Sequence, residues 1–238
     1  MYKRQNQGLA DVLRIGDQHR PELFALQIQR PAGLERAVVE VEGRLDARGQ
    51  EIAPLGLDGQ LRQQLEHWRA AGLRSCAIAL MHAYRNPSHE QALQRLALEL
   101  GFEIVVCSHQ VCPLPRLVPR GQTALVEAAV ARVLRAYLAQ VRADLGEATG
   151  LCVMGSSGAL LDPAALLAKD TILSGPAGGM VGAVAAAQRA GVADGALVGF
   201  DMGGTSTDVF CVPAGVGLAD VERSPQTCLL YTSPSPRD

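Results

Sequence analysis

The sequence has few aromatic residues, no block of basic residues and no long hydrophobic run, and each absence excludes a class of function. Phe, Trp and Tyr make up 4% of the 238 residues, which leaves few rings for stacking on nucleic-acid bases. A formal net charge of −2 without basic clusters argues against a nucleic-acid partner. No apolar run approaches the ~20 residues that span a bilayer, and the first residues lack the hydrophobic segment of a secretory signal. We therefore expect a cytoplasmic enzyme or binding protein for small molecules, with neither a nucleic-acid nor a membrane partner.

Three common motifs of catalysis and phosphate binding are also missing. The glycine-rich segment 173–187 lacks both the Gly-Lys-Ser/Thr ending of a Walker A loop and the G-x-G-x-x-G spacing. In the Gly-Ser-Ser-Gly turn at 155–158, neither serine has glycine two residues away on both sides, so we do not expect a serine nucleophile. We expect this turn to line a ligand site instead. Cys107, His109 and Cys112 are close enough in sequence for a metal site, but no second cluster completes a zinc set. Buried thiols explain the six cysteines better.

Hydrophobic periodicity predicts alternating strands and helices. An apolar run at 76–81, a helix at 89–100 that ends at Gly101 and a second apolar run at 104–107 indicate a parallel βαβ unit. His82 and His89 flank the loop between the first strand and this helix, and we expect them at the surface. Further predicted elements are a helix at 8–15, a hairpin of strands at 37–42 and around 51–52, a helix capped by Asp58, a linker at 113–121, an amphipathic helix at 123–145 and a strand at 151–154.

The most informative stretch is residues 198–209, where an apolar strand leads into Asp201 and the pair Gly203 and Gly204. Three hydroxyl residues (Thr205, Ser206 and Thr207) and a second acid, Asp208, follow before another apolar strand. Glycines let a backbone take positive φ and approach a ligand closely, while free N–H groups and hydroxyls can surround a phosphate. A plain hairpin with solvated threonines has the same local pattern. The coincidence of these groups favours a phosphate-binding turn in which Asp201 holds magnesium or positions the attacking group.

A second glycine-rich element, residues 173–187, reads as a helix dominated by small residues. Gly178 and Gly179 either let another backbone pack closely or admit a nucleotide near the helix N-terminus, where anions are favoured. The pattern alone supports both interpretations equally.

The order of these elements resembles the nucleotide-binding core shared by actin, sugar kinases and chaperone ATPases. More narrowly, the sequence is similar to the hydantoinase A/5-oxoprolinase family over nearly everything from Gly8 to Thr227. The segments that carry this resemblance are 15–16, 19–21, 79–84, 87–90, 108–109, 117–118, 120–121, 172–179 and 199–209. It implies an α/β fold with an actin-like (ribonuclease H-like) ATPase core, incomplete and with parts of two lobes.

The resemblance implies ATP-dependent opening of a cyclic amide, either 5-oxoproline to glutamate or a hydantoin to an N-carbamoyl amino acid. ATP would phosphorylate the carbonyl oxygen and so make a poor electrophile reactive, with Mg2+ and backbone amides stabilising the transferred group. By position, Asp201 would organise Mg2+ or its water, and Gly203 and Gly204 would admit the phosphates. Thr205, Ser206 and Thr207 would donate hydrogen bonds, and Asp208 would lie beside the phosphates or cap the turn.

The sequence departs from the family pattern in two places, and its adapter-like ends suggest an internal fragment. No Asp-x-Gly-Gly-Thr-type loop precedes Gly8, and residues 154–160 differ from the usual Met-Gln-Ser-x-Gly-Gly. We assign 6–119 to the C-terminal part of the family's N-terminal domain and 120–227 to the start of its ATPase domain, with 1–5 and 228–238 derived from adapter sequence. We expect this chain alone to be inactive.

The resemblance also implies a small cyclic-amide substrate, a second subunit or C-terminal domain of hydantoinase B type, and an oligomer in the full-length form. Two alternatives remain open. One is a subunit of acetone carboxylase β type, which activates a ketone with the same core. The other is a nucleotide-binding module without enzymatic activity.

Overall fold

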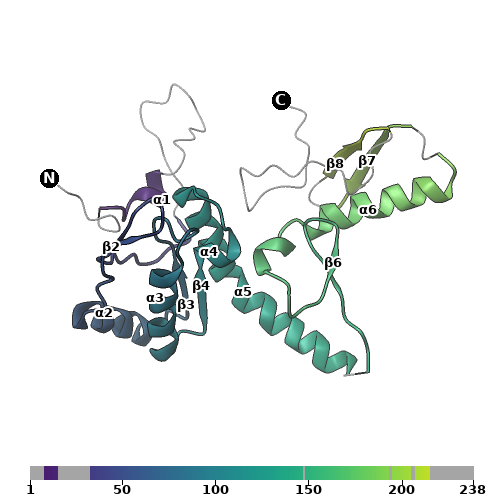
Figure 1. Cartoon of the computed structure of the whole chain (residues 1–238). Coiled ribbons are helices and arrows are strands. Elements are labelled where there is room, and N and C mark those ends of the chain that lie inside the picture. Colours follow the sequence, from purple (N-terminus) through teal and green to yellow (C-terminus); the bar gives the residue numbers. More distant parts are fainter. Residues whose placement is uncertain (1–7, 16–32, 147, 193–194, 205–206, 215–238) are drawn as a thin grey trace. The chain divides into compact units, whose positions relative to one another are not determined.

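The computed structural model describes residues 8–15, 33–146, 148–192, 195–204 and 207–214, which belong to two compact units (Figure 1). Residues 1–133 form the first unit and residues 134–238 the second. The long helix α5 (Leu117–Leu145) runs from the first unit into the second. Each unit has its own hydrophobic cluster.

The predicted βαβ unit is confirmed and forms the centre of the first unit. Strand β3 (Ser75–Ile78) pairs in parallel with β4 (Ile104–Cys107), and helix α3 (Ser88–Glu99) connects them. Gly101 ends the helical segment with φ +85°, a backbone conformation that glycine adopts at little cost. Buried Leu93, Leu96 and Ala97 of α3 pack against the sheet, as the 3.6-residue period requires.

Helix α2 (Gly59–Ala70) covers the same core and begins where the sequence predicts. The side chain of Asp58 accepts a hydrogen bond from the Leu61 N–H at 2.8 Å, which caps the helix. Leu61 and Leu65 are buried, and Trp68 is partly buried against the core. This apolar stripe is the one that the sequence predicts.

The predicted strand at 37–42 is wrong. The hairpin instead pairs β1 (Arg44–Leu45) antiparallel with β2 (Glu51–Ala53), and residues 35–43 form neither helix nor strand. Asp46 fixes the turn because its Oδ1 accepts hydrogen bonds from the Arg48 and Gln50 N–H groups, both at 2.8 Å. The alternating apolar residues at 37–41 therefore do not indicate strand pairing. They line a hollow in the first unit.

Two helices differ from their predicted limits. The N-terminal helix α1 is confined to Val12–Ile15, and α5 begins at Leu117, so the last residues of the predicted linker form its first turns. The predicted apolar face of α5 is also wrong in part, because Val133 and Tyr137 are exposed. Small residues carry the packing instead, since Gly121, Ala124, Ala128 and Ala131 are buried.

In its described residues, the second unit contains the C-terminal end of α5, short strands, a 3-10 helix, a further α-helix and a hairpin. Its elements are β5 (Val153–Met154) paired antiparallel with β6 (Leu160–Leu161), the 3-10 helix η1 (Ala168–Thr171), α6 (Ser174–Arg189) and the antiparallel pair β7 (Leu197–Met202) and β8 (Thr207–Val212). Phe210 and Val212 of β8 are buried against Met180 of α6. The strand–turn–strand prediction for residues 198–209 is confirmed. The opposite face of the hairpin is apolar and exposed at Val198, Phe200 and Val209.

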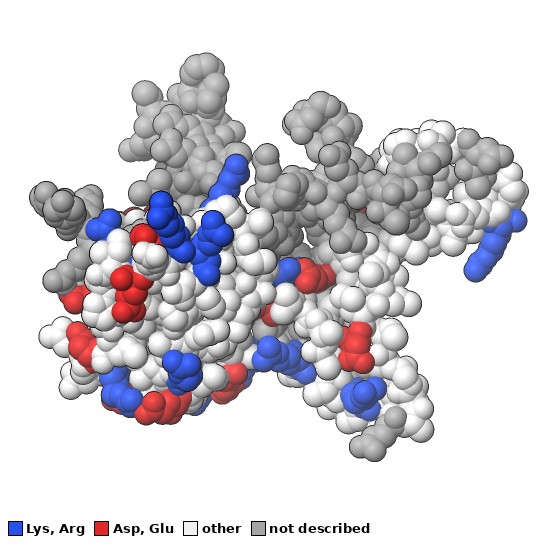
Figure 2. Space-filling view, in the orientation of Figure 1, with Lys and Arg blue, Asp and Glu red and all other residues white. Residues whose placement is uncertain are grey.

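The surface carries acidic and basic side chains in mixture. On the face in Figure 2, basic and acidic groups are interspersed over the first unit without a broad patch of one sign. Within the described residues, no helix is long and apolar enough to cross a membrane. The prediction of buried cysteines holds for Cys107 but is wrong for Cys152 and Cys211, which are exposed.

Candidate functional site

The β7–β8 hairpin brings the two predicted acids together. Asp201 lies directly opposite Asp208, and Gly199 lies opposite Phe210. Directly opposed residues of an antiparallel pair project from the same face, so both carboxylates lie on the face that carries buried Phe210 against α6. Both are exposed, and two like charges in this arrangement repel each other unless a cation lies between them. The pair is therefore suited to hold a divalent cation.

Helix α6 approaches the carboxylate of Asp201 at Gly179. A Cβ placed on Gly179 would lie 2.9 Å from Oδ2 of Asp201, closer than a real Cβ contact. Gly178 is less tightly packed, because its added Cβ would have Met154 Cγ at 3.8 Å. Both glycines lie in the N-terminal half of α6. The structure thus places Asp201 opposite Asp208 on the hairpin and brings Gly179, from the preceding helix, against Asp201.

The turn between the strands is only partly described. Thr205 and Ser206 lie outside the described residues. Gly204 has no neighbouring atom within 4 Å of an added Cβ and does not adopt positive φ, so the expected left-handed conformation is not found there. Gly203, Gly204 and Thr207 are exposed. The open space around Gly204 leaves room for a ligand beside the turn.

The Gly-Ser-Ser-Gly turn at 155–158 has a structural role. The Ser156 hydroxyl accepts a hydrogen bond from the N–H of Leu173, the residue before α6, at 3.0 Å. A Cβ on Gly158 would lie 2.9 Å from Val181 of the same helix. The turn therefore anchors the start of α6.

A buried polar network in the first unit was not singled out as a site from the sequence. Oε1 of Glu90 accepts hydrogen bonds from Leu80 N (2.9 Å), Ser108 Oγ (2.5 Å) and Arg120 Nη1 (3.3 Å). Oε2 accepts from both the backbone N (3.1 Å) and ring Nδ1 (2.6 Å) of His109. Arg120 also donates to Ser108 Oγ and, at 2.7 Å, to the Leu80 carbonyl. Burial lowers the pKa of Arg120, while the Glu90 carboxylate opposes that shift.

The signal for this network was present in the sequence. Glu90 shares the buried face of α3 with Leu93, and Arg120 stands four residues before buried Ala124 on α5. Charged residues at buried positions of a helical period indicate paired or functional groups. Amphipathic patterning alone did not reveal that they pair with each other.

Cys107, His109 and Glu90 are the three potential metal ligands that the described structure places within 4.8 Å of one another. Burial raises the pKa of the Cys107 thiol to about 12, and the nearby Glu90 adds to that shift, so a thiolate ligand is disfavoured. Both Glu90 oxygens already accept protein donors, and the Arg120 cation lies 3.3 Å from one of them. These features argue against a metal ion here.

His82 and His89, both expected at the surface, differ in how far they are buried. His89 is buried, and its Nε2 lies 2.7 Å from Oε2 of Glu51 on β2. His82 is partly buried and has φ +59°, the only positive φ of a non-glycine residue in the described part of the chain. Its carbonyl accepts hydrogen bonds from the N–H groups of Arg85 (2.9 Å) and Asn86 (3.2 Å). The surface prediction is therefore wrong for His89, whose buried ring lies within hydrogen-bond distance of the Glu51 carboxylate.

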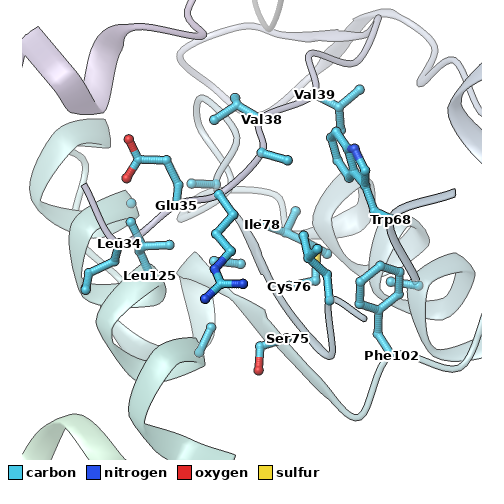
Figure 3. Close-up of a pocket in the computed structure, with 18 of the residues that line it drawn as sticks. Leu34, Glu35, Val38, Val39, Trp68, Ser75, Cys76, Ile78, Phe102 and Leu125 are labelled. Atoms are coloured by element: carbon cyan, nitrogen blue, oxygen red, sulfur yellow. The ribbon is translucent and has the colours of Figure 1, made fainter. Parts of the chain in front are cut away.

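A hollow of about 650 Å³ lies along β3 in the first unit. Figure 3 shows Leu34 and Leu125 on one side of it and Trp68 and Phe102 on the other. Burial raises the pKa of Cys76, which lines it, to about 11, so this thiol is a weak nucleophile at neutral pH. Oε1 of Glu40 accepts three backbone N–H groups of residues 8–10 at 2.6–2.8 Å. The hollow is a packing feature with little reactive chemistry.

Known proteins with similar sequences and structures place this arrangement in context. The chain is 37% identical over 226 residues to 5-oxoprolinase 1 of Arabidopsis thaliana. This match covers 85% of this chain and 18% of the relative. It is 31% identical over 193 residues to caprolactamase subunit alpha of Pseudomonas jessenii. This match covers 79% of this chain and 26% of the relative. The chain thus spans about a fifth of the first relative's length.

Two solved structures share the fold. The ATP-dependent caprolactamase from Pseudomonas jessenii matches with a TM-score of 0.69 and 26% identity over 87% of this chain and 31% of its own. A nucleotide-free acetone carboxylase matches with a TM-score of 0.75 and 24% identity over 96% of this chain and 34% of its own, which shows the fold alone. The predicted α/β fold, part of an actin-like ATPase core, is confirmed.

Two family models cover most of the sequence. Residues 5–101 match the hydantoinase/oxoprolinase N-terminal region, and residues 120–226 match hydantoinase/oxoprolinase. Together with the paired acids beside α6, these matches show that the chain belongs to the hydantoinase/oxoprolinase family.

Proposed function

We infer that this chain is part of an ATP-dependent enzyme that hydrolyses a cyclic amide. The observation that carries the proposal is the pair Asp201 and Asp208 beside the N-terminal half of α6, within a family whose relatives include 5-oxoprolinases and a caprolactamase. The carboxylates would hold Mg2+, and the glycine turn would face the phosphates of ATP. Thr205, Ser206 and Thr207 are the proposed hydroxyl donors. The substrate would be 5-oxoproline, a hydantoin or a larger lactam.

Each residue has a separate task in this proposal. Asp201 orients the cation or a water bound to it, while Gly203 and Gly204 give the phosphates access to the backbone. Gly179 leaves room for the Asp201 carboxylate, and Gly178 lies in the same N-terminal half of α6. When bound, ATP supplies the phosphoryl group that activates the amide carbonyl. A second subunit is also proposed, because the caprolactamase relative is a subunit alpha.

Ketone activation is the second candidate, since the acetone carboxylase structure shares the fold. Substrate-dependent ADP release separates the two in the enzyme that contains this chain, assayed with 5-oxoproline, hydantoin, caprolactam and acetone plus bicarbonate. We expect a cyclic amide to stimulate release several-fold above ATP alone. Stimulation by acetone and bicarbonate only would favour the carboxylase, and stimulation by none would favour a nucleotide-binding module.

The glycine contact gives a matched pair of variants on one helix. Gly179→Ala puts a methyl group against Oδ2 of Asp201, so we expect weaker Mg·ATP binding by about 10-fold, on the order of a displaced charged contact. Gly182→Ala meets open space and should leave binding unchanged while stabilising α6 by about 0.5–1 kcal/mol. Calorimetric titration with Mg·ATP measures both. Equal affinities for the two variants would contradict the assigned role of Gly179.

A further inference from the structure

The Glu90 network lies where the parallel strands of the first unit end. Ser108 and His109 directly follow β4, and Leu80 follows β3 by two residues. In open α/β sheets, ligands bind outside the carboxyl ends of the strands. The network is therefore placed for ligand binding within the first unit.

Glu90 fixes both the position and the tautomer of His109. One carboxylate oxygen accepts the backbone N–H and the ring Nδ1 of the same residue, at 3.1 and 2.6 Å. The other oxygen accepts Ser108 Oγ and Leu80 N and pairs with Arg120, so Glu90 acts as an ionised acceptor. In the neutral imidazole, this contact places the proton on Nδ1 and the lone pair on Nε2.

The Nε2 atom is open to a ligand. The His109 side chain is 13% exposed, and Nε2 makes no hydrogen bond within the described part of the chain. It is also not among the buried unpaired nitrogens of the described residues. A buried Glu–Arg pair contributes little net stability compared with apolar packing, because both ions lose their hydration. Its cost is understandable if the pair holds a functional imidazole in place.

We propose that Nε2 of His109 accepts a hydrogen bond from the ring N–H of the substrate. The identification of that substrate as a cyclic amide rests on the proposed function. A cyclic amide presents an N–H donor beside its carbonyl, and a neutral imidazole nitrogen is a suitable acceptor. His109 is then a residue that distinguishes N–H lactams from N-alkylated ones, and Glu90 and Arg120 position it.

The test compares two variants and two ligands in the enzyme that contains this chain. His109→Asn keeps a side-chain N–H near Nδ1 for Glu90 but leaves the Nε2 position empty, whereas His109→Gln reaches toward Nε2 and loses the bond to Glu90. Affinities for 5-oxoproline and N-methyl-5-oxoproline are measured by calorimetry, thermal midpoints by circular dichroism, and turnover by ADP release.

We expect the wild-type enzyme to prefer the N–H ligand by about 3- to 10-fold, the worth of one hydrogen bond. His109→Asn should abolish that preference and keep the thermal midpoint, while His109→Gln should lower the midpoint and retain part of the preference. Turnover with an unchanged preference in His109→Asn overturns this proposal and leaves the proposed function intact. If the preference depends on His109 but the enzyme shows no turnover, the proposed function is overturned and the contact with His109 stands. If neither ligand binds, both the proposed function and the contact with His109 are overturned.

Discussion

Asp201→Asn is expected to lower the cyclic-amide-dependent ADP release of the enzyme that contains this chain by at least about 10²-fold. Asn keeps the shape of the side chain and one oxygen but loses the negative charge that would hold Mg2+. The Mg2+ concentration needed for half-maximal activity should rise as well. ADP release measured across a Mg2+ titration checks both effects.

Stability distinguishes this loss from misfolding. Asp201 is exposed and lies directly opposite Asp208, so removing one carboxylate relieves a repulsion and should not lower the free energy of unfolding. Asp208→Asn should relieve the same repulsion with a smaller loss of activity. Asp144→Asn, at an exposed position of α5, is the neutral control. Normal turnover in Asp201→Asn would remove this residue from the mechanism.

Arg120→Met is expected to lower the free energy of unfolding of the first unit by about 3–5 kcal/mol. Arg120 and Glu90 are both fully buried, and their side chains lie 3.3 Å apart. Removing the guanidinium leaves the Glu90 carboxylate without its compensating charge, removes the donor to Ser108 Oγ and removes one of the two donors to the Leu80 carbonyl, which keeps the Ala83 N–H at 3.4 Å. Urea unfolding followed by the fluorescence of Trp68, the single tryptophan, reports on this unit.

Two further variants show whether the loss comes from the buried pair. Arg62→Met breaks an ion pair with Glu99 that is exposed on both sides, and little change is expected. The double variant with Glu90→Gln and Arg120→Met should lose less than the sum of the single losses, because the neutral amide no longer needs the guanidinium. Additive losses would show that Arg120 and Glu90 do not stabilise each other.

Local patterns predicted the elements well where the residues needed no distant partner. The cap at Asp58, the stop at Gly101 and the strand–turn–strand around Asp201 each depend on neighbours a few residues away. The strand expected at 37–42 was wrong because strand formation needs a paired neighbour, which alternation of apolar residues does not supply. The predicted apolar face of α5 was wrong in part, because the buried side of a helix depends on the segments that pack against it.

The candidate sites show the same division. The sequence singled out Asp201, Asp208 and Gly179, but it could not tell whether Gly179 served packing or a ligand. The close approach of its Cα to the Asp201 carboxylate became visible only in the fold. Likewise, His109 and Glu90 are separated by 19 residues, and the shared carboxylate contact arises because β4 returns beside β3.

The sequence by itself determined the α/β class, the βαβ rhythm and the acid–glycine–hydroxyl turn, because these follow from periodicity and from residues close together in the chain. The family followed from the resemblance of several separated motifs to those of known proteins. Tertiary structure decided which charged residues are buried, which histidines contact a carboxylate and which glycine lies against a carboxylate. These outcomes depend on contacts between segments that lie far apart in the chain, whose free energies come from desolvation and close packing rather than local propensity.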